Sequence, residues 1–321
     1  MKFNKLIRFG LVVALIFSSG VGVGRYKVFP FAEFKKVKDV SVDVIEKFTH
    51  KERQISNERL LSTSSMNPMT FIAYGDNPYV SENDVESAIG ELLEAINIQN
   101  TSLVVHVGDM FNTGESCTNS MIDLQLEMMN KLNGPVLYTP GDNDWTDCRD
   151  ETKGDTHRLE RLSYIRETYF NNQQTLGKNS EFVENQSERG YPENVRLIKN
   201  NVAFITAHVV GSNNNFDPTS ERNTKEAFER DAANIDWVTE SFNRYENASA
   251  FVVAIHADMF QERIFKEVGE STVYPYETVV TDVFRPKRAF QNFSNALNQL
   301  SNKYERPVLL LFGDSHIFRT F

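Results

Sequence analysis

Four aspartates stand directly after glycine at the ends of apolar runs, and residues of this type and spacing can bind metal ions. The four endings are Gly75-Asp76, Gly108-Asp109, Gly141-Asp142 and Gly313-Asp314. Each apolar run predicts a buried strand, and glycine lets the chain turn sharply behind it. Because strand ends of an α/β sheet converge on a crevice, we expect the four carboxylates to meet. Carboxylates that lie so close together repel one another unless a cation lies among them, so the pattern predicts a metal site.

The elements that must position these aspartates alternate between strand and helix. Amphipathic helices are expected over 81–96 and 121–132 between the first three strands, with Ser81 as the first N-cap. This β-α-β-α-β order predicts a sheet that is at least partly parallel. Residues 145–192 are polar and predict a rim over the site, with one helix near 159–169. The later elements are expected to be a hairpin around 199–201, a helix over 225–245, a strand ending at His256, a helix over 293–304 and a strand before Asp314.

The N-terminal region has a different character. Three basic residues precede an apolar stretch over 9–23, which is typical of a secretory signal or a short membrane anchor. We therefore expect a signal peptide or membrane anchor over 1–30, a stalk and linker over 31–69, and one globular domain over 70–321. An uncleaved anchor is favoured, with cleavage as the alternative. In either case the domain is exported, anchored facing the periplasm or exterior, or secreted.

Composition limits the function classes. The chain has 321 residues and a formal net charge of −10. An acidic chain is a poor partner for a phosphate backbone, so we expect no nucleic-acid binding. The two cysteines, Cys117 and Cys148, each follow one of the Gly-Asp endings. If those endings converge, the cysteines are close, and an exported compartment permits a disulfide between them. Two unpaired thiols are the alternative.

The order and spacing of the motifs resemble the calcineurin-like metallophosphoesterase family over residues 70–321. That family carries Asp-x-His, Gly-Asp-x-x-Asp/Asn, Gly-Asn-His-Asp/Glu, a lone His at a strand end, and Gly-His-x-His. This chain departs from the pattern at four positions, because Pro78, Asn143 and Asp314 replace histidines and Asp142 replaces an asparagine. The matching segments are Asp76-Asn77-Pro78, Gly108-Asp109-Met110-Phe111-Asn112, Gly141-Asp142-Asn143-Asp144, His256 and Gly313-Asp314-Ser315-His316.

The resemblance implies an α/β fold, a four-layer α/β/β/α sandwich of two mixed sheets flanked by helices, with two divalent metal ions. Pro78 cannot coordinate, so the first ion is one ligand short. An oxygen-rich ligand set favours Mn²⁺, Mg²⁺ or Fe, with Zn²⁺ also possible. The implied ligands are Asp109 as a bridge, Asp76 and His316 for the first ion, and Asp142, His256 and Asp314 for the second.

The implied activity is hydrolysis of phosphate mono- or diesters of small molecules by a metal-activated water. Asn143 cannot act as a general acid, but its amide can donate a hydrogen bond to phosphate. His208 is the candidate proton donor, with a structural role as the alternative. Asn112 and Arg149 are candidate substrate contacts, and so are Asn213 to Asn215; for Arg149 and these asparagines the alternative is that they are ordinary loop residues.

Two other functions remain open from the sequence. An inactive scaffold would explain the replaced histidines, and a single-cation module would bind an anion without hydrolysing it. Family members usually continue with further strands beyond the last motif, so such strands are expected to be missing after His316.

Overall fold

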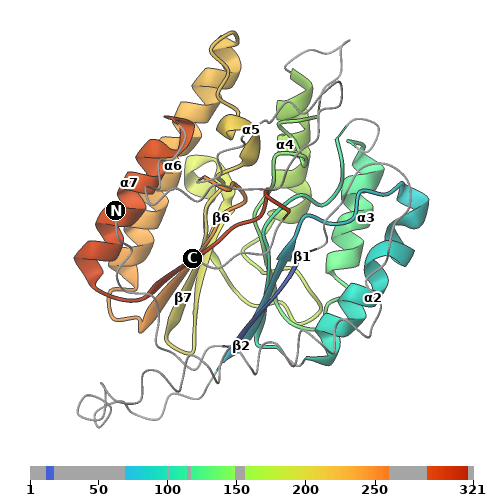
Figure 1. The fold of residues 1–321 in the computed structure, drawn as a ribbon, viewed down its shortest axis with the longest axis horizontal. Coiled ribbons are helices and arrows are strands. Elements are labelled where there is room, and N and C mark those ends of the chain that lie inside the picture. Colours follow the sequence, from blue (N-terminus) through green and yellow to red (C-terminus); the bar gives the residue numbers. More distant parts are fainter. Residues whose placement is uncertain are drawn as a thin grey trace, which may run out of the picture.

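Two facing sheets with helices on both outer sides make up the described part of the chain (Figure 1). The computed structural model describes residues 12–17, for which only the backbone is considered, and residues 69–99, 101–113, 117–148, 156–259 and 288–316. This arrangement is the predicted four-layer α/β/β/α sandwich. In Figure 1, α2 and α3 cover one outer side, and α6 and α7 cover the other.

The first sheet is parallel throughout its described strands, in the order β1-β2-β3-β4. Ser81 occupies the predicted N-cap position, at the start of a short 3₁₀ turn that leads into the helix from Val85, but its hydroxyl donates to Asp84 Oδ2 at 2.7 Å and makes no capping bond to the backbone. The strands are β1 (Val12–Phe17), β2 (Thr70–Gly75), β3 (Leu103–His106) and β4 (Val136–Tyr138), and the helices beside them are α2 (Val85–Ile98), α3 (Asn119–Met129) and α4 (Thr156–Tyr169).

Part of the apolar N-terminal stretch lies in this sheet. Residues 12–17 form the edge strand β1, which pairs in parallel with β2. Within the described ranges, no helix is both long and apolar enough to cross a membrane. The rest of 1–68 lies outside the described residues, so the signal peptide or anchor and the stalk stay predictions.

The second sheet is mixed, in the order β5-β6-β7-β8-β9. Strands β5, β6 and β7 pair antiparallel, whereas β7, β8 and β9 pair in parallel. Asn200 and Asn201 have φ of 48° and 63°, which are the left-handed angles of a type I′ hairpin turn. The elements are β5 (Glu184–Gln186), β6 (Tyr191–Lys199), β7 (Val202–Thr206), α5 (Gly211–Asn214), α6 (Glu221–Arg244), β8 (Ala250–Ala254), α7 (Gln291–Tyr304) and β9 (Val308–Leu311).

Strand β2 shows how the apolar layers arise, because successive side chains of a strand point to opposite faces. Phe71 and Ala73 pack between the two sheets, where the ring of Phe71 meets that of Phe204 edge to face, with centroids 5.1 Å apart. Ile72 and Tyr74 point the other way, into the core beneath the helices. Both faces are buried, so the strand is a continuous apolar run.

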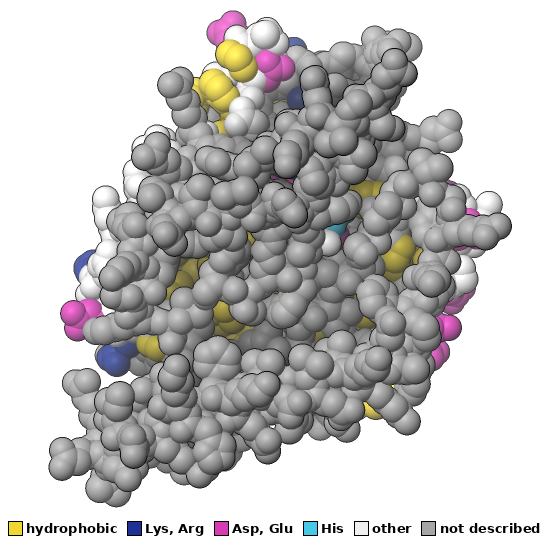
Figure 2. Space-filling model, in the orientation of Figure 1, with side chains coloured by type: hydrophobic (Ala, Val, Ile, Leu, Met, Phe, Trp, Pro, Cys, Tyr) yellow, Lys and Arg dark blue, Asp and Glu magenta, His cyan; other side chains and the backbone are white. Residues whose placement is uncertain are grey.

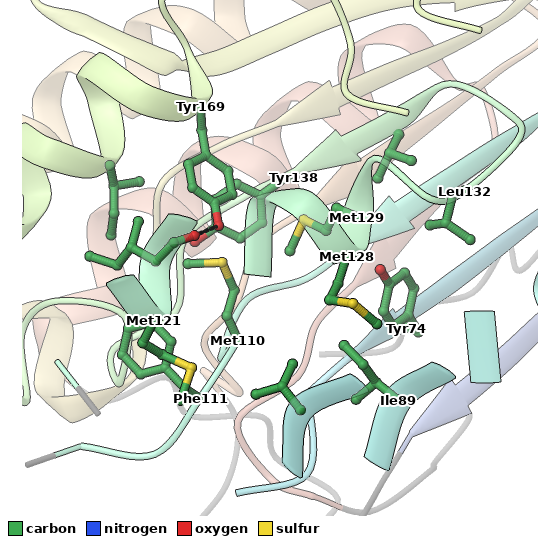
Figure 3. Packing of buried hydrophobic residues seen from close by; sticks show 14 of the residues in the cluster. Tyr74, Ile89, Met110, Phe111, Met121, Met128, Met129, Leu132, Tyr138 and Tyr169 are labelled. Atoms are coloured by element: carbon green, nitrogen blue, oxygen red, sulfur yellow. Dashed lines mark hydrogen bonds between the residues drawn. The ribbon is translucent and has the colours of Figure 1, made fainter. Parts of the chain in front are cut away.

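The core between the first sheet and its helices is rich in methionine and tyrosine, as Figure 3 shows. The buried hydroxyl of Tyr169 donates to the carbonyl of Ile122 at 2.7 Å, which satisfies its polar end. In Figure 2 most of the visible charged side chains lie at the edges of the molecule, and hydrophobic side chains are visible between them. Labelled members of this core in Figure 3 include Tyr74, Met110, Met121, Met128, Met129 and Tyr138.

Candidate metal centre

The candidate ligands lie at the carboxyl ends of strands from both sheets, where parallel α/β sheets place their sites. Together they form two overlapping groups of side chains, Asp76 with Asp109 and His316, and Asp109 with Asp142 and His256. Within each group the ligand atoms lie within 4.8 Å of one another. The first sheet supplies Asp76, Asp109 and Asp142 after β2, β3 and β4, and the second supplies His256, Asp314 and His316 after β8 and β9.

Asp109 belongs to both groups, and its two oxygens face different sides. Its Oδ1 lies 3.3 Å from His256 Nε2 and accepts the backbone N–H of Asn143 at 3.1 Å. Its Oδ2 accepts the hydroxyl of Tyr79 at 3.2 Å, on the side of His316. A carboxylate in this position is suited to bridge two cations.

His256 is oriented as metal-binding histidines usually are. Its Nδ1 donates to the carbonyl of Val107 at 2.7 Å, which directs Nε2 toward Asp142 Oδ1 at 2.8 Å. A backbone acceptor on the far nitrogen fixes the tautomer and the ring orientation of a ligating histidine. The ring is fully buried, so each of its nitrogens needs a partner of this kind.

Glycine precedes the aspartates because the chain approaches the carboxylates closely. A Cβ on Gly141 would lie 2.1 Å from Asp109 Oδ1, and one on Gly313 would lie 2.6 Å from Asp76 Oδ2. The Gly-Asp endings therefore make room for the neighbouring ligand as well as for the turn.

Several candidate ligands have left-handed backbone angles that ordinary residues avoid. The φ values are 51° for Asp76, 57° for Asp109, 68° for Asp314 and 53° for His316. Aspartate tolerates this region better than most residues, but it is sparsely populated and is found at functional sites more often than elsewhere.

Asp144 holds the loops of the site together and belongs to neither candidate ligand group. Its carboxylate accepts the backbone N–H of Met110 and of Gly141, both at 2.7 Å, and the hydroxyl of Tyr138 at 2.8 Å. It also accepts the backbone N–H of Asp109 at 3.1 Å. These four bonds fix the loop after β3 against the loop after β4.

The electrostatics of the centre favour a cation. Burial, together with the nearby carboxylates, raises the pKa of Asp109 well above its usual range. Burial lowers the pKa of His256, but the charges of Asp109 and Asp142 outweigh this and raise it well above the ordinary value. Two divalent cations among these carboxylates would replace the protons that the cluster otherwise attracts. The donor set of carboxylates and imidazoles therefore fits the implied metal ions.

Four other predicted site residues lie in different positions. Asp314 belongs to neither ligand group, so its role as a ligand stays a prediction. Its side-chain Oδ2 accepts the backbone N–H of Asp258 at 3.3 Å, and its backbone N–H donates to Asp76 Oδ1 at 3.1 Å. Asn143 Nδ2 donates to Tyr79 at 2.7 Å, at the site. Asn112 is exposed, with its Oδ1 on the N–H of the next residue. Arg149 lies outside the described residues.

The surroundings of His208 do not favour the predicted role of proton donor. Its Nδ1 lies 2.7 Å from Glu193, and its Nε2 accepts the indole N–H of Trp145 at 3.0 Å. The imidazole is fully buried, and both nitrogens are engaged. Burial lowers its pKa to about 4, so the ring is neutral at pH 7. These contacts agree with the alternative prediction, in which His208 has a structural role.

The predicted disulfide between Cys117 and Cys148 is confirmed, with 5.8 Å between the Cα atoms. It joins the segment after Asp109 to the segment after Asp142. The two Gly-Asp endings therefore do converge, as the sequence argument requires.

Two features of the site are visible only in the folded chain, namely the contacts of Tyr79 and the conformation of the turn beside Asp142. Tyr79 contacts candidate ligands, and Pro78 before it was the only hint of a change there. The turn Gly211–Asn214 has left-handed angles at Ser212, Asn213 and Asn214, and buried Arg230 donates to the side chain of Asn214 at 2.6 Å. The run of asparagines in this turn is of the residue type that best tolerates such angles, apart from glycine.

Comparison of the sequence with models of known protein families identifies the family of this chain. Residues 69–318 match the model of the calcineurin-like phosphoesterases. No curated protein matches the chain significantly.

Proposed function

The chain belongs to the calcineurin-like phosphoesterase family, and from this premise we propose that it is a metal-dependent hydrolase of phosphate mono- or diesters. The observation that carries the proposal is the position of Asp109, whose two oxygens face two different groups of ligands. Cations held there would act as Lewis acids on the phosphate and lower the pKa of a water molecule.

The residues of this chain support the reaction in three ways. Asp109, Asp142 and His256 are buried, which keeps bulk water from competing for the cation. The side-chain amide of Asn143 donates one N–H to Tyr79 at 2.7 Å and has a second N–H that can donate to a phosphate oxygen. Asp144 keeps both loops in place, so the ligands are preorganised.

The test is hydrolysis of mono- and bis-aryl phosphates by the purified full-length chain with Mn²⁺, Fe²⁺ or Zn²⁺. We expect turnover that needs metal and is lost in Asp109→Asn, with two ions bound per wild-type chain. One ion and no turnover would point to an anion-binding module. No bound ion and no turnover in a folded chain would point to an inactive scaffold.

We also propose that the domain acts outside the cytosol, facing the periplasm or exterior. The disulfide supports this, because such bonds persist in oxidising compartments. Thiol alkylation of intact cells, followed by mass spectrometry, should find Cys117 and Cys148 unmodified. Labelled cysteines in freshly opened cells would contradict an oxidising location.

A further inference from the structure

Tyr79 brings a hydroxyl group to the first group of ligands. Its oxygen lies 3.2 Å from Asp109 Oδ2 and 3.1 Å from His316 Nε2. The side chain is half-buried, and its ring packs edge to face against that of His316, with centroids 5.6 Å apart. The oxygen also accepts the side-chain N–H of Asn143 at 2.7 Å.

These separations match those between neighbouring ligands of one cation. In an octahedral site with bonds of about 2.1 Å, adjacent ligand atoms lie about 3 Å apart. Asp76 Oδ1 and His316 Nε2, which belong to the same group, are themselves 3.4 Å apart. The Tyr79 oxygen therefore stands where a further ligand of that group would stand.

The local sequence explains why such a ligand is needed. The side chain of Pro78 has no ligand atom, and within the part of the chain that the structure describes this group has three His or Asp members, Asp76, Asp109 and His316. A tyrosine one residue later, on the same loop after β2, can reach the open position. Phenol oxygen is a hard donor, which agrees with the carboxylate-rich character of the centre.

We propose that the Tyr79 hydroxyl oxygen is a ligand of the cation held by Asp76, Asp109 and His316. This rests on the proposed function, since it requires that the centre binds metal. On binding to a ferric ion, the oxygen–metal bond forms and the hydroxyl proton passes to solvent. The amide of Asn143 then donates its hydrogen bond to the phenolate.

Loading with iron(III), supplied as its citrate complex, tests this without any assay of activity. A phenolate bound to iron(III) gives a charge-transfer band in visible light and tyrosinate vibrations in the resonance Raman spectrum. We expect both in the wild type and neither in Tyr79→Phe. The matched control is Tyr164→Phe, which removes a surface hydroxyl bonded to Asp123, and which should keep both signals.

Metal affinity gives a second measurement. Calorimetric titration with Mn²⁺ should show one site weakened at least about tenfold in Tyr79→Phe and unchanged in Tyr164→Phe. If the wild type binds metal but shows no phenolate signal, or if Tyr79→Phe keeps the affinity, Tyr79 is only a hydrogen-bond partner and the inference fails. If the folded wild type binds no metal at all, it is the proposed function that fails. The wild-type Raman spectrum decides the question even if Tyr79→Phe does not fold.

Discussion

Replacing His208 with glutamine should flatten the pH dependence of stability. Trp145 donates to His208 Nε2 at 3.0 Å, so that nitrogen must stay unprotonated in the folded chain. Burial lowers the pKa of His208 from 6.5 to about 4. In the unfolded chain the imidazole takes up a proton below pH 6.5, whereas the folded chain resists this down to about pH 4. The contribution of His208 to stability is therefore full above pH 6.5 and is lost as the pH falls toward 4.

The size of the effect follows from that pKa difference. Each pH unit within the window costs about 1.4 kcal/mol of the free energy of unfolding. Between pH 7 and pH 5 the loss from this one group amounts to about 2 kcal/mol. The glutamine side chain of His208→Gln has polar atoms that can replace part of both hydrogen bonds, so we expect the variant to fold. Its free energy of unfolding should not show the fall of about 2 kcal/mol between pH 7 and pH 5.

The assay is urea unfolding of wild type and variant at pH 7, 6 and 5, followed by tryptophan fluorescence, with a chelator present throughout. Titration of the metal ligands is common to both proteins and cancels in the comparison. Equal pH dependence of the two proteins would refute the reasoning. So would a His208 imidazole resonance in the wild type that titrates near pH 6.

Two further substitutions and the reduction of the disulfide test the framework of the site. Asp144→Asn should cost about 3 kcal/mol of unfolding free energy, measured by urea unfolding, because an amide cannot accept all four hydrogen bonds; a loss below about 1 kcal/mol would contradict this. Reducing the disulfide between Cys117 and Cys148, 31 residues apart, should lower stability by about 3.5 kcal/mol, and an unchanged melting temperature in reductant would oppose it. Gly141→Ala should abolish metal binding in calorimetry, because its Cβ would lie 2.1 Å from a ligand oxygen. The control Gly90→Ala, with nothing within 4 Å of its Cβ, should bind metal normally and be about 0.5 to 1 kcal/mol more stable.

The layered fold is predictable from the sequence because its central strands are buried on both faces. Strand β2 is an unbroken apolar run for this reason, and Asn200 with Asn201 marks a hairpin turn by residue type alone. The start of β6 is not predictable in this way. Glu193 and Asn194 look like loop residues, but both are buried in the strand, where Glu193 pairs with Arg166 at 2.5 Å. Tertiary partners decide such positions.

Some residues of the candidate metal centre could also be predicted from the sequence, and others could not. Asp109 and His256 follow strand ends, and the order of the motifs along the chain is enough to predict that they meet. The contacts of Tyr79 depend on the path of a loop after Pro78, which no periodicity describes. For His208 the residue type suggested proton transfer, whereas the two partners that occupy its nitrogens are visible only in the folded chain.

The division of ligands between the two sheets has a consequence for the order of folding. The first sheet is built from residues before 139 and the second from residues after 183. Neither segment alone carries all members of either candidate ligand group, because His256 and His316 come from the later one. A nascent chain therefore cannot assemble the centre until both halves have docked. Binding of cations at this centre would therefore be a late event that depends on correct assembly, and bound ions would raise the free energy of unfolding by mass action.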